Sequence, residues 1–272
     1  MARGEIVRQH FRYDRCPPGN GWEQTVITDP HFYMIAIPAV LLYGMSKGGL
    51  GPAIGVIVVP AMALVINPVK AAAIMLPILC VMDLFAVWRF RKSYDLHHLK
   101  ILLPAGIVGI VIASFFMGHL SPATIRVMIG VVAVVFCLNY WFRGSSIQNK
   151  KGGRLSGYLW GTVAGFTSTQ IHAGGPPVTI YLLPQNLDKI VLMGTMAVFF
   201  TVINYLKLIP YTILGALDAA NLTTSLVLMP LAPIGVKLGY VVLHRAPQKH
   251  IYQFLYIALF LSGAKLLYDG IF

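Results

Sequence analysis

Long apolar stretches separated by short polar or charged segments run from about residue 32 to the end of the chain. A hydrocarbon core about 30 Å thick is crossed by roughly 20 apolar residues in an α-helix. Charge-free stretches of this order, two of them containing a histidine, lie at residues 48–69, 101–125, 127–142, 155–187, 190–206, 219–236 and 251–264. The pattern predicts an all-α polytopic membrane protein.

Two of these stretches contain residues that interrupt a membrane helix. Residues 46–52 read SKGGLGP, and residues 173–177 read AGGPP. A single helix over residues 32–66 would be about 52 Å long at 1.5 Å per residue, too long for one crossing without extreme tilt. We therefore expect two glycine-broken segments, and ordinary helices at about residues 70–90, 100–118, 123–142, 189–210, 219–243 and 249–268.

Landmark residues recur at a nearly constant offset, which indicates an internal duplication. Gly44 and Gly165 lie 121 positions apart, as do Asp83 and Asn204, while Pro104 lies 126 positions before Pro230. Each copy would hold about four to five membrane segments. The predicted parts are a polar N-terminal tail (1–31), a first transmembrane repeat (32–143), a basic cytoplasmic linker (144–154) and a second transmembrane repeat (155–272).

Basic residues predict which loops face the cytoplasm, because cytoplasmic loops carry an excess of Lys and Arg. In the first half the basic loop is at residues 89–100, whereas in the second half it comes one loop later, at residues 244–250. This shift is explained if residues 155–183 form a hairpin, so that the second repeat is inverted relative to the first. Parallel halves made of eight single crossings are the alternative.

Composition and charge exclude several other classes. The chain is 57% hydrophobic with a net charge of +12, and its basic residues gather at the ends of apolar segments, which fits membrane topology better than nucleic-acid binding. The three cysteines show no CxxC spacing. We therefore expect no disulfide framework, no metal site and no cofactor.

Each glycine break is expected to free a helix N-terminus, with proline in the first turn of the following helix. Unpaired N–H groups and the helix dipole make such an end an anion site. Backbone of this kind within a membrane must line a cavity or be buried in protein. The candidate substrate-binding residues are Ser46, Lys47, Gly48, Gly49, Gly51, Thr167, Ser168, Thr169, Gln170, His172, Gly174 and Gly175.

Three further roles follow from ionisable or polar groups inside the spans, where such groups are expensive and often functional. Lys47 is expected either to bind the anion or to form an internal ion pair with Asp83. Asp83 and Asn204 occupy equivalent positions in the two halves, and Asp83 is either the partner of Lys47, a proton site or a structural residue. His172 either carries a coupled proton or is a structural histidine.

The motifs GMSKGGLG at residues 44–51 and AGGPPVTIYLL at residues 173–183, in their duplicated layout, resemble the TauE/SafE sulfite exporter family, also called the 4-toluene sulfonate uptake permease family. The resemblance covers residues 32–270. It implies a multi-pass permease of the bacterial inner membrane that moves sulfite, organosulfonates or related anions. His172 departs from the more open glycine cluster of many relatives.

The sequence leaves other assignments open. The resemblance implies a small anionic substrate. The broken helices and the expected inverted repeats favour alternating access as the mechanism, and an anion channel is the main alternative. An integral membrane enzyme is less favoured, because no HExxH or CxxC motif and no convincing nucleophile is present. Assembly into a homo-oligomer stays open.

Overall fold

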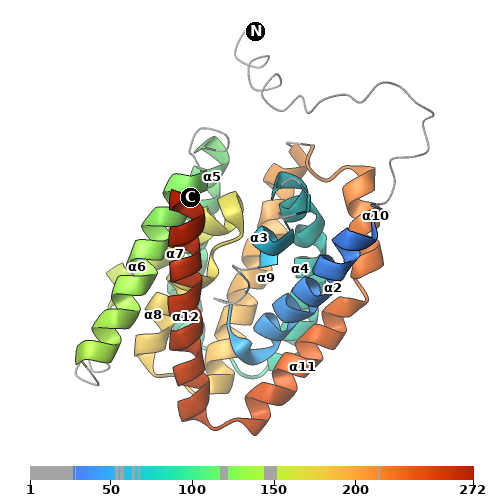
Figure 1. Cartoon of the computed structure of the whole chain (residues 1–272). Coiled ribbons are helices and arrows are strands. Elements are labelled where there is room, and N and C mark those ends of the chain that lie inside the picture. Colours follow the sequence, from blue (N-terminus) through green and yellow to red (C-terminus); the bar gives the residue numbers. More distant parts are fainter. Residues whose placement is uncertain are drawn as a thin grey trace, which may run out of the picture.

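The computed structural model describes residues 27, 29–52, 55, 58–62, 65–66, 68–116, 122–143, 152–213 and 215–272. Most of the predicted N-terminal tail and residues 144–151 of the predicted linker lie outside this set. The described residues form helices, turns and loops, with no strand among them (Figure 1).

The first half holds α2 (Pro30–Met45), the π-helical segment η1 (Ser46–Leu50), α3 (Val58–Met62), α4 (Pro68–Phe90), α5 (Leu96–Phe116) and α6 (Pro122–Arg143). The second half holds α7 (Arg154–Ile171), α8 (Gly175–Leu182), the 3-10 turn η4 (Leu183–Gln185), α9 (Lys189–Ile213), α10 (Ala219–Leu228), α11 (Leu231–Arg245) and α12 (Gln248–Ile271). Both glycine-rich motifs interrupt helices, as predicted.

Five described helical segments are long and apolar enough to cross a membrane: Pro30–Leu50, Lys70–Phe90, Leu96–Phe116, Lys189–Ile213 and Gln248–Ile271. A sixth crossing results if α10 and α11 are counted as one span, although they meet at an angle of 45°. The single helix expected over residues 219–243 is therefore wrong. The bend falls at Pro230, which precedes the first residue of α11 and has no amide hydrogen to continue the helical pattern.

The helices pack in a few extensive pairs, of which α5 with α7, α6 with α12, α2 with α11 and α4 with α9 are the largest. Glycines bring two of these pairs into backbone contact. A Cβ added at Gly44 would lie 2.8 Å from the Gly235 Cα, and one added at Gly165 would lie 2.0 Å from the Gly106 carbonyl oxygen. Small residues allow this close approach in membrane bundles, where helix association depends on packing contacts.

The segment formed by α7, α8 and η4 starts and ends at the same end of the bundle. The Gln185 side-chain amide donates to the Gly152 carbonyl oxygen across 3.1 Å, so a residue two positions before α7 contacts the last residue of η4. This geometry agrees with a hairpin and not with a single crossing.

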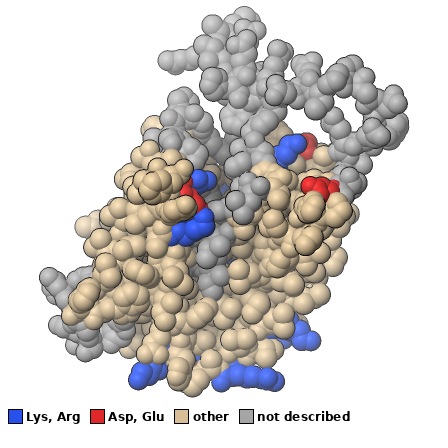
Figure 2. Space-filling model, in the orientation of Figure 1, with Lys and Arg blue, Asp and Glu red and all other residues tan. Residues whose placement is uncertain are grey.

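The loops at that end contact one another. Tyr252 at the start of α12 donates to Leu187 across 2.6 Å, and the backbone N–H of Asp95 donates to Thr195 of α9 across 2.9 Å. In the orientation of Figure 2, several Lys and Arg side chains lie at the lower end of the described surface. The two basic loops that the sequence singled out therefore lie at one end of the molecule.

Candidate functional site

The first break is closed by its own residues. The π-helical segment ends at Gly51, whose φ of 87° lies in the left-handed region that favours glycine. The Ser46 hydroxyl donates to the Gly51 carbonyl oxygen across 2.7 Å, and the Gly51 N–H donates to the Ser46 carbonyl oxygen across 3.0 Å. In this conformation the Ser46 hydroxyl hydrogen stabilises the turn and is not directed toward a ligand.

The glycines of the first break serve close packing against α11. A Cβ added at Gly48 would lie 2.1 Å from the Val236 carbonyl oxygen, and one added at Gly49 would lie 2.6 Å from that of Gly239. Pro52 lies in a turn, and the next described α-helix is α3, whose described residues are Val58–Met62. The helix N-terminus expected directly after the first break falls on a stretch in which residues 53, 54, 56 and 57 lie outside the described residues, so it stays a prediction.

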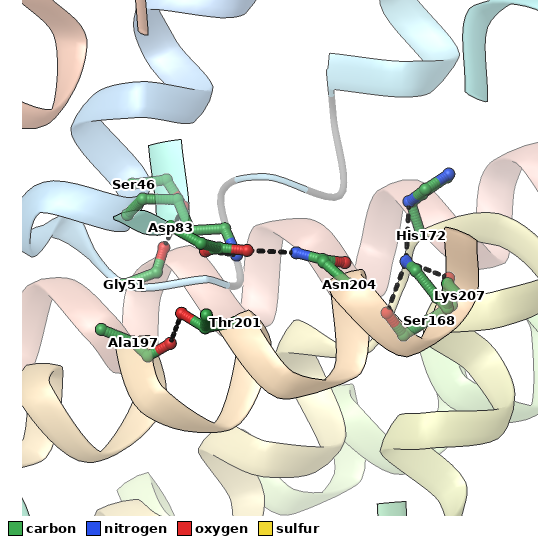
Figure 3. Close-up of polar contacts among 10 residues, drawn as sticks. Ser46, Gly51, Asp83, Ser168, His172, Ala197, Thr201, Asn204 and Lys207 are labelled. Atoms are coloured by element: carbon green, nitrogen blue, oxygen red, sulfur yellow. Dashed lines mark hydrogen bonds and ion pairs between the residues drawn. The ribbon is translucent and has the colours of Figure 1, made fainter. Parts of the chain in front are cut away.

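Lys47 forms the ion pair that was one of its two predicted roles. Its Nζ lies 2.6 Å from Asp83 Oδ1, and both side chains are buried. The other carboxylate oxygen, Asp83 Oδ2, accepts from the Asn204 side-chain amide across 2.6 Å (Figure 3). The two landmark residues 121 positions apart are thus in direct contact, and the carboxylate is shared between the two halves.

The second break has a different geometry. The left-handed residue His172, with a φ of 53°, ends α7, and α8 begins three residues later at Gly175. Pro176 and Pro177 lie in the first turn of α8, as predicted, and no side chain caps that helix end. The second break therefore leaves a helix N-terminus inside the protein, buried among other residues.

Several predicted donors at the second break bond to nearby backbone. The Thr167 hydroxyl donates to Val163 across 2.8 Å and also lies 3.0 Å from the Ala173 carbonyl oxygen. The Thr169 hydroxyl donates to Gly165 across 2.8 Å. Gln170 donates to Ala113 of α5 across 3.1 Å, so its amide contacts the α5 backbone.

Sequence reasoning placed Lys207 near the end of the helix expected at residues 189–210 but did not single it out as a site residue. The residue lies inside α9, which extends to Ile213, and its side chain is fully buried. Its Nζ contacts the Ser168 carbonyl oxygen at 2.9 Å, the Ser168 hydroxyl at 3.0 Å and His172 Nδ1 at 3.1 Å (Figure 3). The spacing could have revealed it, since positions three apart share one helix face and Lys207 follows Asn204 by three.

Phe200 of α9 lies between the two breaks. Lys47 Nζ is 4.6 Å from the centre of the Phe200 ring, which is a cation–π distance. The Cε1 atom of Phe200 would lie 3.1 Å from a Cβ added at Gly174. The lysine of the first break and the turn of the second break therefore both approach the same aromatic side chain. The structure brings the two motifs close together, although they are more than 100 residues apart in the chain.

A groove of about 300 Å³ between α5 and α9 is a separate feature. Its lining is almost entirely apolar and includes none of the predicted site residues; it consists of Ile107, Ile110, Val111, Ser114, Phe115, Leu206, Ile209, Pro210 and Ile213. The polar cluster at the two breaks is thus distinct from this groove.

Comparison with curated proteins and with solved structures finds no match to the chain. The family model described as "Sulfite exporter TauE/SafE" matches residues 36–266, which include both breaks, the Lys47–Asp83 pair and Lys207. Most of the described chain lies within the match. The chain therefore belongs to the TauE/SafE sulfite exporter family, a family of membrane transporters and not of enzymes.

Proposed function

We propose that this protein moves sulfite, an organosulfonate or a related small anion across the bacterial inner membrane by alternating access. The observation that carries the proposal is the buried cation Lys47, which lies on an interrupted membrane segment and contacts the same aromatic ring as the second break. A buried ionisable group in a membrane span is costly and is commonly retained for function.

The anion would bind to Lys47 in place of Asp83. A buried charge left without a partner is strongly unfavourable, and the carboxylate supplies that partner in the described conformation at 2.6 Å. An arriving anion that takes over Lys47 would leave Asp83 bonded to Asn204, a donor that can stabilise it on the other side. The Lys47–Asp83 pair and the anion-bound Lys47 would then be two alternative states of the site.

The N-terminus of α8 would supply a second attraction. Because Pro176 and Pro177 occupy its first turn and no side chain caps it, the backbone N–H groups at Gly174 and Gly175 and the helix dipole are available to a negative charge. The predicted substrate-binding role of Gly174 and Gly175 rests on this geometry. Phe200 separates this helix end from Lys47, so its side chain would move when the anion enters.

We also propose that the chain consists of two inverted repeats, an arrangement that recurs in transporters with broken helices. In this arrangement α2, α4, α5 and α6 correspond to α7, α9, α11 and α12. The contacts support it, because the pair α2–α11 has its equivalent in the pair α7–α5. In addition, α4 packs on its own counterpart α9, and α6 packs on its own counterpart α12. The carbonyl oxygen of Ser93, after α4, would lie 1.7 Å from a Cβ added at Gly194, near the start of α9. These counterparts are therefore antiparallel, as inversion requires.

The basic end of the molecule would face the cytoplasm. The loop after α4 and the loop between α11 and α12 both lie there, and Lys and Arg are concentrated in cytoplasmic loops. For an anion that leaves the cell without a co-ion, an inside-negative membrane potential contributes about 2.3 kcal/mol per charge per 100 mV. The potential favours export only to the extent that each transport step carries net negative charge.

Flux measurements in proteoliposomes test this function. Labelled sulfite, methanesulfonate and sulfolactate would be followed in both directions with the intact protein, with Lys47→Met and with Gly175→Leu. Lys237→Met is the matched control, since Lys237 lies on the exposed face of α11. We expect flux in the intact protein and in the control, and a loss of at least about tenfold in the two site variants. Unchanged flux in both site variants would refute the site.

Electrical recordings separate a transporter from the channel alternative. Alternating access requires a conformational change for each anion, and such domain motions take microseconds to milliseconds. Single-channel currents through the reconstituted protein would exceed any such turnover and would replace the transporter proposal with the channel.

A further inference from the structure

Lys207 is a buried amine whose contacts are all to neutral groups. Its side chain is fully buried, and its Nζ lies within 3.1 Å of three atoms: the Ser168 carbonyl oxygen, the Ser168 hydroxyl oxygen and His172 Nδ1. A protonated amine has three N–H donors and no acceptor. The three contacts match those three donors, so the charged form of Lys207 is fully hydrogen-bonded.

The neutral form of Lys207 is satisfied by the same atoms. A neutral amine has two N–H donors and one lone pair. The two donors can remain on the Ser168 carbonyl oxygen and on His172 Nδ1, while the lone pair accepts the Ser168 hydroxyl hydrogen. Apart from the proton itself, the charged and neutral forms of Lys207 differ only in the rotation of the Ser168 hydroxyl. The cage around Lys207 therefore holds either protonation state without leaving a buried polar group unpaired, which would be costly.

The ionisable groups around Lys207 include one carboxylate, and it is already engaged. The groups near enough to influence Lys207 electrostatically are Lys47 from the first break, Cys80 and Asp83 from α4, and His172 after α7. Tyr211 of α9 contacts His172 on its other side. Asp83 bonds to Lys47 and Asn204. With Lys47 and Asp83 neutralising each other, a charged Lys207 adds one uncompensated positive charge to this buried cluster.

His172 and Tyr211 extend the cage. His172 Nε2 lies 3.2 Å from the Tyr211 hydroxyl, which donates to the Thr169 carbonyl oxygen across 3.2 Å. With Nδ1 accepting from Lys207, Nε2 carries the ring hydrogen and donates to Tyr211. These two contacts hold His172 in the neutral tautomer that has its hydrogen on Nε2, so that Nδ1 is free to accept from Lys207. We therefore assign His172 a structural role and place the exchangeable proton on Lys207.

We propose that Lys207 is a proton-binding site that takes up one proton with each anion that the protein carries. This inference rests on the proposed function. When an anion enters the cluster, a proton from water on that side forms the third N–H bond of Lys207 and balances the added negative charge. When the anion leaves on the other side, the N–H bond breaks and the proton returns to water there. Anion and proton then move together.

Methanesulfonate is the probe, because it is the anion of a strong acid and itself carries no proton near neutral pH. Proteoliposomes would report labelled methanesulfonate flux together with the internal pH, which gives the number of protons moved per anion. The variants are Lys207→Met, which removes the amine, and Lys207→Arg, which keeps a permanent positive charge that cannot be released. Lys237→Met is the control for loss of an exposed lysine on α11.

We expect about one proton per anion in the intact protein and in Lys237→Met, and none in Lys207→Arg even where anion flux persists. The affinity for methanesulfonate should fall about tenfold per pH unit on the alkaline side in the intact protein, and should lose this dependence in Lys207→Arg, because anion and proton binding are linked reciprocally. Folding of each variant would be checked by its melting temperature in detergent.

Flux of methanesulfonate without proton movement in the intact protein would overturn the proposal and leave the transport function standing. The same conclusion follows if Lys207→Met or Lys207→Arg moves as many protons per anion as the intact protein. If the intact protein moves none of sulfite, methanesulfonate and sulfolactate, the proposed function fails and the proton site fails with it. Should both variants fail to fold, proton uptake by the detergent-solubilised intact protein on addition of methanesulfonate decides.

Discussion

The two helix breaks share a glycine-rich sequence, but the buried lysine beside each of them has different hydrogen-bond partners. At the first break Lys47 pairs with the carboxylate of Asp83 at 2.6 Å. At the second break Lys207, which comes from α9, contacts only a serine and a histidine. The first lysine is compensated by a buried negative charge, whereas the second has only neutral hydrogen-bond partners. We propose that both breaks contact the anion and that only the second binds the coupled proton.

The backbones differ as well. The first break is a π-helical segment that ends in a left-handed glycine, and Pro52 directly after it lies in a turn. The second break is a left-handed histidine followed directly by an uncapped helix with two prolines in its first turn. Among the described residues, the first break contributes a buried side-chain cation and the second an uncapped helix N-terminus.

The largest effect is expected from breaking the ion pair at the first break. Lys47→Met leaves the Asp83 carboxylate buried with Asn204 as its remaining direct partner, and removing one partner of a buried pair costs about 3–5 kcal/mol. The melting temperature in detergent should fall strongly. The double variant Lys47→Met with Asp83→Leu should recover most of that loss, since no uncompensated charge remains; a double variant no more stable than Lys47→Met would contradict this account.

Added methyl groups test whether both breaks depend equally on backbone contact. A Cβ would meet the Val236 carbonyl oxygen at 2.1 Å in Gly48→Ala and that of Gly106 at 2.0 Å in Gly165→Ala. Overpacking of this kind costs about 1–3 kcal/mol, so both variants should melt at a lower temperature. Gly153→Ala is the matched control, because nothing lies within 4 Å of its added Cβ. If Gly165→Ala left the melting temperature unchanged, α7 and α5 could move apart without loss of stability, which would contradict the prediction.

Tyr211→Phe sharpens the comparison at the second break alone. It removes the hydroxyl that donates to Thr169 and contacts His172, at a cost of about 1 kcal/mol for one hydrogen bond. The melting temperature should fall slightly, and the pH dependence of methanesulfonate binding should shift while the Lys47–Asp83 pair is untouched. Tyr252→Phe, which removes a hydrogen bond to Leu187 at the basic end, is the control and should leave that pH dependence unchanged.

The smallest effect is expected for the exposed lysine of α11. Lys237→Met should change the melting temperature by less than the equivalent of about 0.5 kcal/mol, as is usual for surface positions. It separates the effect of burial from the effect of removing any lysine from a membrane helix. A loss of stability as large as that of Lys47→Met would show that burial is not what distinguishes the three lysines.

The sequence by itself determined the helical membrane class, the family and the positions of both breaks. Hydrophobic length, glycine and proline act over a few neighbouring residues, so their consequences can be read locally. It also proposed the partner of Lys47 as one of two roles, because a buried cation requires compensation wherever the chain folds. The bend at Pro230 was missed, since a proline in an apolar stretch can be accommodated within a helix as well as at its end.

Only the tertiary structure decided how the polar residues are used. Hydroxyls at Ser46, Thr167 and Thr169 had suggested ligand donors, yet each bonds to nearby backbone that the interrupted segments would otherwise leave exposed. Lys207 lay within an expected helix but near its end, and only the packing of α9 shows that its side chain is buried beside residues of α7. The physical reason is that hydrogen-bond partners in a membrane protein come from segments distant in the chain, and their identity depends on how the helices pack.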